Sequence, residues 1–160
     1  MLDQKEHPVM ILIPGNEVTD REGDKDYSEI GKYKVEQQGE NVAILALGDF
    51  YQRGEQLSAK IKAEFGFTPT LINPRFASGI DKELLESLSE RHQMVITMED
   101  GILSGGFGEK IASFYGSSDM KVKNYGLDKK FYDRYDPNEL LKEVGMTPVQ
   151  IIADICNQIK

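Results

Sequence analysis

The order of apolar and polar residues along this chain predicts strands separated by helices. Short, unbroken apolar runs are typical of strands that are covered on both faces, as in parallel sheets. A run in which apolar and polar residues alternate indicates an edge strand instead. The predicted strands, beginning with the edge strand, lie near residues 33–35, 42–47, 70–73, 94–98 and 122–125.

Helices are predicted between these strands, where apolar residues recur on one helical face. We expect Asp81 to cap one helix and Gly66 to end another. The last two helices have the clearest starts, because Asp136 and Thr147 are each followed by proline and then by Glu or Gln at the third helical position. The pattern predicts an α/β fold, a three-layer αβα domain with a mostly parallel sheet of about five strands and one antiparallel edge strand.

The first 30 residues differ from this pattern. Residues 9–13 form an apolar segment that ends at a Pro-Gly breaker, and residues 16–30 are rich in charge and poor in large apolar groups. Such a stretch is typical of a connector or an exposed loop. We therefore expect residues 1–30 to be the tail strand of a preceding domain plus a charged linker, and residues 31–160 to form one domain.

Composition limits the classes of protein to consider. A chain of 160 residues, 39% of them hydrophobic, fits one globular domain. The formal net charge of −8 argues against nucleic acid, whose phosphates require a basic surface. No apolar stretch approaches the roughly 20 residues that span a bilayer, and no signal-peptide core follows Met1. Cys156, the single cysteine, is expected to pack among the isoleucines of the last helix. We expect a cytoplasmic protein.

The most informative stretch is residues 94–115, where an apolar strand leads into Glu99, Asp100 and a glycine-rich helix start. Carboxylates just past such a strand lie at the carboxyl edge of the sheet, where open α/β folds usually contact ligands or partners. The glycine spacing fits neither a Walker loop, which needs Gly-Lys-Ser/Thr, nor the dinucleotide fingerprint, whose third glycine is isoleucine here. Gly105 and Gly106 are expected to allow close packing in a tight turn; the alternative is an amide surface that faces a partner or an anion.

The titratable residues do not form a recognisable catalytic set. Glu99 and Asp100 are adjacent, so on an extended backbone they point to opposite sides and cannot be a simple acid/base pair. A solvated or cap-forming acidic turn is favoured over a magnesium site shared with Asp49. His7 and His92 have no serine, cysteine or carboxylate at a catalytic spacing, and we expect both on the surface.

Two further features favour a contact surface. Arg75 directly follows a predicted strand, so its guanidinium is expected to pair with Glu99 or Asp100 at a neighbouring strand end, or to serve an interface. Phe131 and Tyr132 lie in a loop that mixes aromatic and charged residues, and such aromatics are enriched where domains or subunits meet. The residues alone thus predict a contact edge, with no catalytic residue and no metal or cofactor site. The interface or anion-contact candidates are Arg75, Glu99, Asp100, Gly105, Gly106, Phe131 and Tyr132.

Four groups of residues, in this order, carry a resemblance to a known family: 42–47, 73–76 with 79–81, 95–101 with 104–108, and 124–127. Their order and spacing resemble the C-terminal domain of transketolase-like thiamine-diphosphate enzymes. The Arg-Phe pair before the Ile-Asp helix start and the closing Gly-Met-Thr helix start look most like 1-deoxy-D-xylulose-5-phosphate synthase. The resemblance extends from near residue 30 to the C-terminus.

The resemblance implies that the chain is part of a larger transferase, as a fragment or a separate subunit. Enzymes of this family have three domains, of which the first two hold thiamine diphosphate and magnesium, and full-length enzymes are expected to be homodimers. The synthase joins pyruvate to glyceraldehyde 3-phosphate with loss of carbon dioxide, on the route to isoprenoid, thiamine and pyridoxal precursors. The third domain would have a structural and subunit-contact role beside the N-terminal and pyrimidine-binding domains. We expect the isolated chain to be inactive.

One departure and two alternatives remain. The family's preceding strand carries arginines on both sides of a Tyr-Pro pair near the substrate phosphate, whereas residues 12–15 here are Leu-Ile-Pro-Gly. The substrate of the parent enzyme is therefore open. The alternatives are the C-terminal part of a split transketolase or of a 2-oxoacid dehydrogenase beta subunit, and a stand-alone α/β domain that binds a ligand or metal.

Overall fold

A computed structural model describes residues 8–11, 13, 29 and 31–159 of the chain. Its strands are β1 (Lys34–Gln37), β2 (Asn41–Ala46), β3 (Thr70–Asn73), β4 (His92–Ile102) and β5 (Lys121–Leu127). Its helices are α1 (Tyr51–Phe65), α2 (Lys82–Leu88), α3 (Phe107–Tyr115), α4 (Pro137–Glu143) and α5 (Pro148–Ile155), with a short 3-10 turn η1 (Gly48–Phe50) before α1. None of the helices among the described residues is long and apolar enough to cross a membrane.

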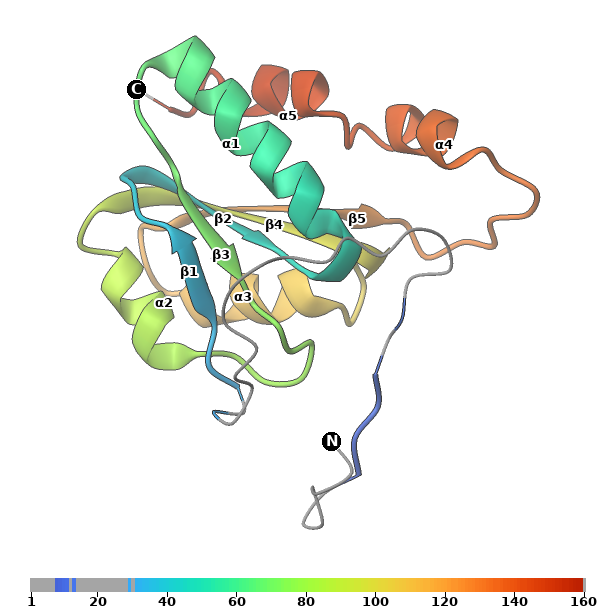
Figure 1. The fold of residues 1–160 in the computed structure, drawn as a ribbon, viewed down its shortest axis with the longest axis horizontal. Helices are drawn as coiled ribbons and strands as arrows, with labels where there is room; N and C mark the ends of the chain where they lie inside the picture. The colour runs from blue at the N-terminus through green and yellow to red at the C-terminus, as the bar shows by residue number, and fades with distance from the viewer. Residues whose placement is uncertain (1–7, 12, 14–28, 30, 160) are drawn as a thin grey trace.

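The five strands form one sheet in the order β1-β3-β2-β4-β5 (Figure 1). β1 pairs with β3 antiparallel, and every other neighbouring pair is parallel. Helices α1, α4 and α5 lie on one face of the sheet, and α2 and α3 lie on the other (Figure 1). The predicted three-layer αβα fold with an antiparallel edge strand is confirmed.

The alternation of side chains along each strand divides the core into two halves. In β2, Val42 and Ile44 face the helices α1 and α5, while Ala43 and Leu45 face α2 and α3. All four are completely buried, as expected for a central parallel strand covered on both faces. The unbroken apolar run in the sequence follows from this double burial.

The helix ends follow the sequence signals. The Asp81 side chain accepts a hydrogen bond from the Leu84 N–H, and Asp136 accepts from the amides of the first turn of α4. Thr147 and Gln150 form the predicted capping box of α5. Gly66 ends α1 in the left-handed conformation, with φ of +79°, which glycine adopts at no steric cost.

The model corrects three expectations. β4 does not end at Met98 but continues to Ile102, which pairs with Leu127 after a register shift in the ladder. Glu99 and Asp100 are therefore inside the last part of this strand and not past it. His92 is buried and not on the surface, because it is the first residue of β4 and lies under α2. Cys156 is exposed at the end of α5 and does not pack in the core.

The N-terminal segment is described only in part. Val9, Met10, Ile11 and Ile13 are exposed. Residues 9–11 and 13 of the predicted tail strand are described and belong to no strand, and their assignment to a preceding domain stays a prediction. His7 and the charged linker, apart from Glu29, lie outside the described residues.

Candidate functional site

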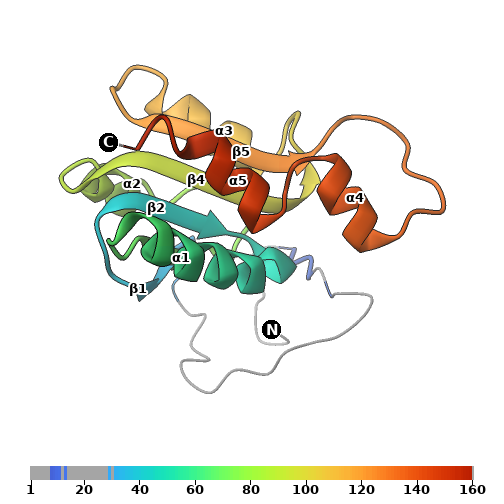
Figure 2. The same cartoon turned by 90° about the horizontal axis from the view of Figure 1, so that it is seen from above.

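The parallel strands β2, β3, β4 and β5 end at a common edge, which we call the carboxyl edge. The segments that leave it are η1, the turn after Asn73, the glycine turn before α3, and the loop between β5 and α4. In Figures 1 and 2 this last loop projects beyond the ends of the strands. The edge is the usual place for ligand or partner contacts in folds of this class.

Glu99 is the central polar residue of the edge. Its side chain is only 5% exposed, and its carboxylate accepts hydrogen bonds from the amides of Phe107, at 2.9 Å, and Gly108, at 2.8 Å. These amides belong to the first turn of α3, where unpaired N–H groups and the helix dipole favour a negative charge. Glu99 therefore caps α3, in agreement with the preferred cap-forming interpretation of this acidic turn.

The glycines before α3 make room for this carboxylate. A Cβ atom on Gly106 would lie 2.5 Å from the Ile102 carbonyl oxygen and 2.6 Å from Glu99 Oε2, so a larger residue cannot be placed there without movement. The predicted close packing is confirmed for Gly106, whereas Gly105 has open space around it and contributes a left-handed backbone, with φ of +77°.

The amides of the glycine turn are engaged within the chain. The Gly105 N–H donates to the Glu109 carboxylate, and the Gly106 N–H donates to the Leu103 carbonyl at 2.9 Å. The next two amides bind Glu99. All four N–H groups thus have acceptors within the chain, and the alternative of an anion site has no support from them. Whether Gly105 and Gly106 face a partner stays a prediction.

The other acidic residues of the edge do not join Glu99. Asp49 and Asp100 are exposed, whereas Glu99, the neighbour of Asp100 on β4, is buried. No group of three His, Cys, Asp or Glu side chains within the described part of the chain is arranged to hold a metal ion. The magnesium alternative has no support from these residues.

Arg75 lies elsewhere than expected. Its backbone has a φ of +61°, an uncommon value for a residue with a side chain. Its guanidinium donates to the Lys32 carbonyl, with Nη2 at 3.0 Å, and so ties the turn after β3 to the segment before β1. The expected pairing with Glu99 or Asp100 assumed neighbouring strands, which is wrong because β2 separates β3 from β4.

The loop at residues 128–136, which we call the aromatic loop, carries exposed aromatic side chains at this edge. Phe131 is fully exposed at 105%, and Tyr135 is 53% exposed. Tyr132 is half-buried and packs edge-on against Tyr135, with ring centroids 6.2 Å apart. Ile102, 41% exposed, was not singled out from the sequence. Its position could have drawn attention to it, because it is an apolar residue two positions after the acidic pair Glu99 and Asp100.

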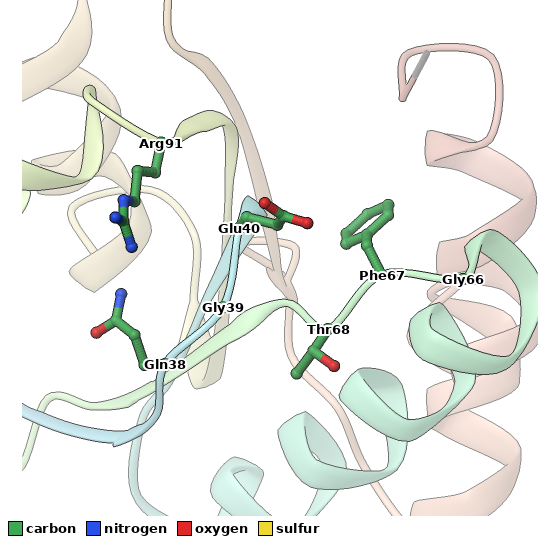
Figure 3. Close-up of a pocket in the computed structure, with 7 residues that line it drawn as sticks. All are labelled: Gln38, Gly39, Glu40, Gly66, Phe67, Thr68 and Arg91. Atoms are coloured by element: carbon green, nitrogen blue, oxygen red, sulfur yellow. The ribbon is translucent and has the colours of Figure 1, made fainter.

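An open hollow of about 450 Å³ lies at the opposite edge of the sheet. It is lined by Gln38, Gly39, Glu40, Gly66, Phe67, Thr68 and Arg91 (Figure 3). The Arg91 and Gln38 side chains point toward one another in Figure 3, and the Glu40 N–H donates to the Thr68 carbonyl at 3.0 Å. These contacts join the turns at the amino ends of the strands, away from the carboxyl edge.

His92, the first residue of β4, directly follows Arg91 in the chain. Its Nε2 is 2.8 Å from Thr70 Oγ1 and its Nδ1 is 2.9 Å from the Leu88 carbonyl oxygen, so both ring nitrogens have a partner. Burial lowers the pKa of the imidazole below its usual range. The His92 imidazole, neutral and hydrogen-bonded at both nitrogens, has a structural role and is not a catalytic base.

Together the fold and the edge define a class, a three-layer α/β domain whose carboxyl edge engages its buried carboxylate internally and exposes aromatic side chains. Residues 31–151 match the family model described as "Transketolase, C-terminal domain". The chain belongs to this family.

Curated relatives are similar over most of the chain. It is 34% identical to the 1-deoxy-D-xylulose-5-phosphate synthase of Shouchella clausii over 156 residues, which are 95% of this chain and 25% of that protein. The synthase of Prochlorococcus marinus is 32% identical over 89% of this chain and 22% of its own length. The chain thus spans about a quarter or less of the curated relatives that it matches.

Solved structures have the same fold. One described as "Split gene transketolase, inactive beta4 tetramer" has a TM-score of 0.71 and 25% identity, covering 81% of this chain and 42% of that chain. A 2-oxoglutarate:ferredoxin oxidoreductase from Magnetococcus marinus has a TM-score of 0.51 and 17% identity, over 81% of this chain and 20% of its own. The second likeness concerns the fold alone.

Proposed function

We propose that this chain works as the C-terminal domain of a thiamine-diphosphate-dependent transferase of the 1-deoxy-D-xylulose-5-phosphate synthase kind. Its role is to dock against the other domains and to support subunit contacts, and it catalyses no reaction by itself. The observation that carries the proposal is the carboxyl edge, where Glu99 is engaged by α3 while Phe131 is fully exposed. Such an edge suits a protein partner better than a small polar substrate.

The described residues do not fit the cofactor of such enzymes. A diphosphate with magnesium needs carboxylate or carbonyl ligands and free amide or cationic groups. The described part of the chain has no metal-binding cluster of three His, Cys, Asp or Glu residues, and the first amides of α3 are occupied by Glu99. In this proposal the cofactor belongs to the parts of the enzyme that correspond to the remaining length of the relatives.

The parent reaction is the decarboxylating union of pyruvate with glyceraldehyde 3-phosphate, in a cytoplasmic homodimer, on the route to isoprenoid precursors. Residues 9–13 act as the last strand of the preceding domain. Residues 12–15 carry no arginine. Because a phosphate needs cationic partners, the parent enzyme binds a phosphorylated acceptor more weakly than a synthase with arginines there.

The direct test is an activity assay on the isolated chain. It is incubated with thiamine diphosphate, magnesium, pyruvate and glyceraldehyde 3-phosphate, and carbon dioxide release is measured beside the full-length Shouchella clausii synthase as a positive control. The expected result is no release above the protein-free background. Robust turnover by the isolated chain would refute the docking role.

A second candidate function is the C-terminal subunit of a split transketolase. It is supported by the likeness to the split-gene transketolase, at 25% identity and a TM-score of 0.71. Co-purification from the source cell distinguishes the two candidates, because a split enzyme yields a separate N-terminal polypeptide. A reading frame that continues upstream of Met1 into a pyrimidine-binding domain would favour the first candidate.

A further inference from the structure

The aromatic loop has a defined conformation even though it projects from the sheet. The Asp128 N–H donates to the Tyr132 hydroxyl at 3.1 Å, and the Lys130 ammonium lies 4.9 Å from the centre of the Tyr132 ring. Lys130 also forms an ion pair with Glu143 of α4, at 3.4 Å. At the far end, Asp136 caps α4. The loop is therefore fixed at both ends and around Tyr132 before any partner arrives.

Phe131 differs from its neighbours in this arrangement. Tyr132 is held by Asp128, Lys130 and Tyr135, whereas the whole Phe131 side chain is exposed to solvent. Because the loop backbone around the Phe131 ring is already restrained, docking the ring costs mainly the freedom of its own side-chain torsions. Exposed aromatic anchors of this kind supply a large share of the binding energy in protein interfaces.

The apolar surface continues from the loop onto the sheet. Ile102 pairs with Leu127, the residue just before the loop, and the Leu103 N–H donates to the Leu127 carbonyl at 2.9 Å. Ile102, 41% exposed, thus lies beside the start of the aromatic loop. The half-exposed Tyr135 lies near its end.

The charge of the loop differs from that of the whole chain. Its three acidic residues, Asp128, Asp133 and Asp136, are balanced by Lys129, Lys130 and Arg134. The chain has a formal net charge of −8. A second copy of so acidic a chain would be repelled at long range, while the neutral loop can meet a partner whose rim has charges of both signs.

We propose that Phe131 is the anchor by which this domain docks onto the rest of its enzyme, where it fills an apolar pocket rimmed by mixed charges. The partner is the polypeptide that corresponds to the remaining three quarters of the synthase relatives, of which this chain spans 25% in Shouchella clausii. Tyr132, Lys130 and Asp136 are positioning residues that hold the loop. The proposal rests on the function proposed above and names the contact through which it is carried out.

The test uses a chimera in which this chain replaces the matching C-terminal quarter of the Shouchella clausii synthase. Three variants are compared with the parent chimera: Phe131→Asp, the conservative Phe131→Leu, and the control Val149→Asp. Val149 is also an exposed apolar residue, at 61%, but it lies on α5 outside the loop. Carbon dioxide release and the temperature of half-inactivation are measured for each.

We expect the Phe131→Asp chimera to lose at least tenfold in rate and to inactivate at a lower temperature. Phe131→Leu and Val149→Asp should stay within about twofold of the parent chimera, since an aliphatic side chain still fills an apolar pocket and Val149 is outside the contact. The isolated chain with Phe131→Asp should melt at the wild-type temperature, because the ring contributes no packing within the chain. That measurement excludes misfolding as the cause.

The possible failures are distinguishable. A Phe131→Asp chimera as active and as heat-resistant as the Val149→Asp chimera would overturn the role of Phe131 and leave the proposed function intact. An inactive parent chimera would count against the proposed function and the anchor together. If sedimentation shows that the isolated chain self-associates and that Phe131→Asp makes it monomeric, the occupant is a second copy and the proposal of a docking partner is wrong.

Discussion

Replacing Glu99 with glutamine tests the central contact of the carboxyl edge with a change of a few atoms. The wild-type carboxylate accepts from Phe107 and Gly108, at 2.9 and 2.8 Å. Glutamine is almost the same size but has one acceptor oxygen and one NH₂ group. The NH₂ group would face a backbone N–H, so one of the two amides would lose its acceptor inside the protein.

The magnitude follows from these two bonds. Loss of one hydrogen bond to a charged acceptor costs about 1.5–3 kcal/mol. Neutralising the acceptor weakens the remaining bond and removes the favourable interaction with the helix N-terminus, which adds about 1 kcal/mol. We therefore expect Glu99→Gln to lower the free energy of unfolding by about 3 kcal/mol. For a chain of this length, that corresponds to a fall in melting temperature of roughly 6–12 °C.

The assay is urea unfolding followed by circular dichroism, with Asp100→Asn as the matched control. Asp100 is the next residue along β4 and is exposed, so the same loss of charge there should change the free energy of unfolding by less than about 0.5 kcal/mol. Hydrogen exchange should show faster exchange of the Phe107 and Gly108 amides in Glu99→Gln only. If Glu99→Gln is as stable as Asp100→Asn, Glu99 does not cap α3 in solution and the assignment of the edge is wrong.

Two further predictions concern the core. Burial holds the pKa of His92 below its usual range, so the unfolded chain takes up a proton before the folded one does, and stability should fall as the pH drops below about 6.5 toward the lower folded pKa. Urea midpoints measured between pH 8 and pH 5 should show this slope, and a His92→Gln variant with the same slope would contradict it. A Cβ on Gly108 would lie 2.5 Å from Thr97 Oγ1, whereas one on Gly116 has its nearest neighbour at 3.4 Å. Gly108→Ala should therefore lose about 1–3 kcal/mol and Gly116→Ala should not; equal melting temperatures for the two would refute the packing argument.

The fold was predictable because its elements are encoded by local signals. The central strand β2 is buried on both faces, and that burial leaves a continuous apolar run in the sequence. Asp136 and Thr147 each combine a capping side chain with proline at the first helical position, which restricts the backbone to a helix start. Signals of this kind do not depend on contacts with distant residues.

The predictions that were wrong depend on contacts between residues distant in sequence, or on which face of a helix a residue occupies. His92 is buried because Thr70, 22 residues earlier, supplies a partner for its ring, and the sequence does not show that pairing. The end of β4 depends on Ile102 pairing with Leu127 on another strand. Cys156 follows the buried Ile155 by one residue, so a helical turn of about 100° takes its side chain off the buried face.

The candidate site was predictable in its residues but not in their roles. The sequence placed Glu99 and the glycines together, yet it left open whether the helix start binds an external group or an internal one. The model answers this for α3, where the carboxylate of Glu99 takes the position that an anion occupies in other α/β folds. Arg75 was expected beside Glu99 only because the strand order was unknown, and β2 lies between their strands.

Two features of the carboxyl edge, the capping of α3 by Glu99 and the exposure of Phe131, both favour a protein partner over a small polar ligand. A free helix N-terminus attracts anions, and at the start of α3 the almost completely buried Glu99 satisfies it from within the chain. A fully exposed phenylalanine is unfavourable for a different reason, because folding leaves its apolar surface in contact with water. A protein that only needed to be stable and soluble would gain from a polar residue at position 131. Since the loop around Phe131 is held in place by its neighbours, the exposed ring is best explained by a contact that is completed only when the rest of the enzyme is present.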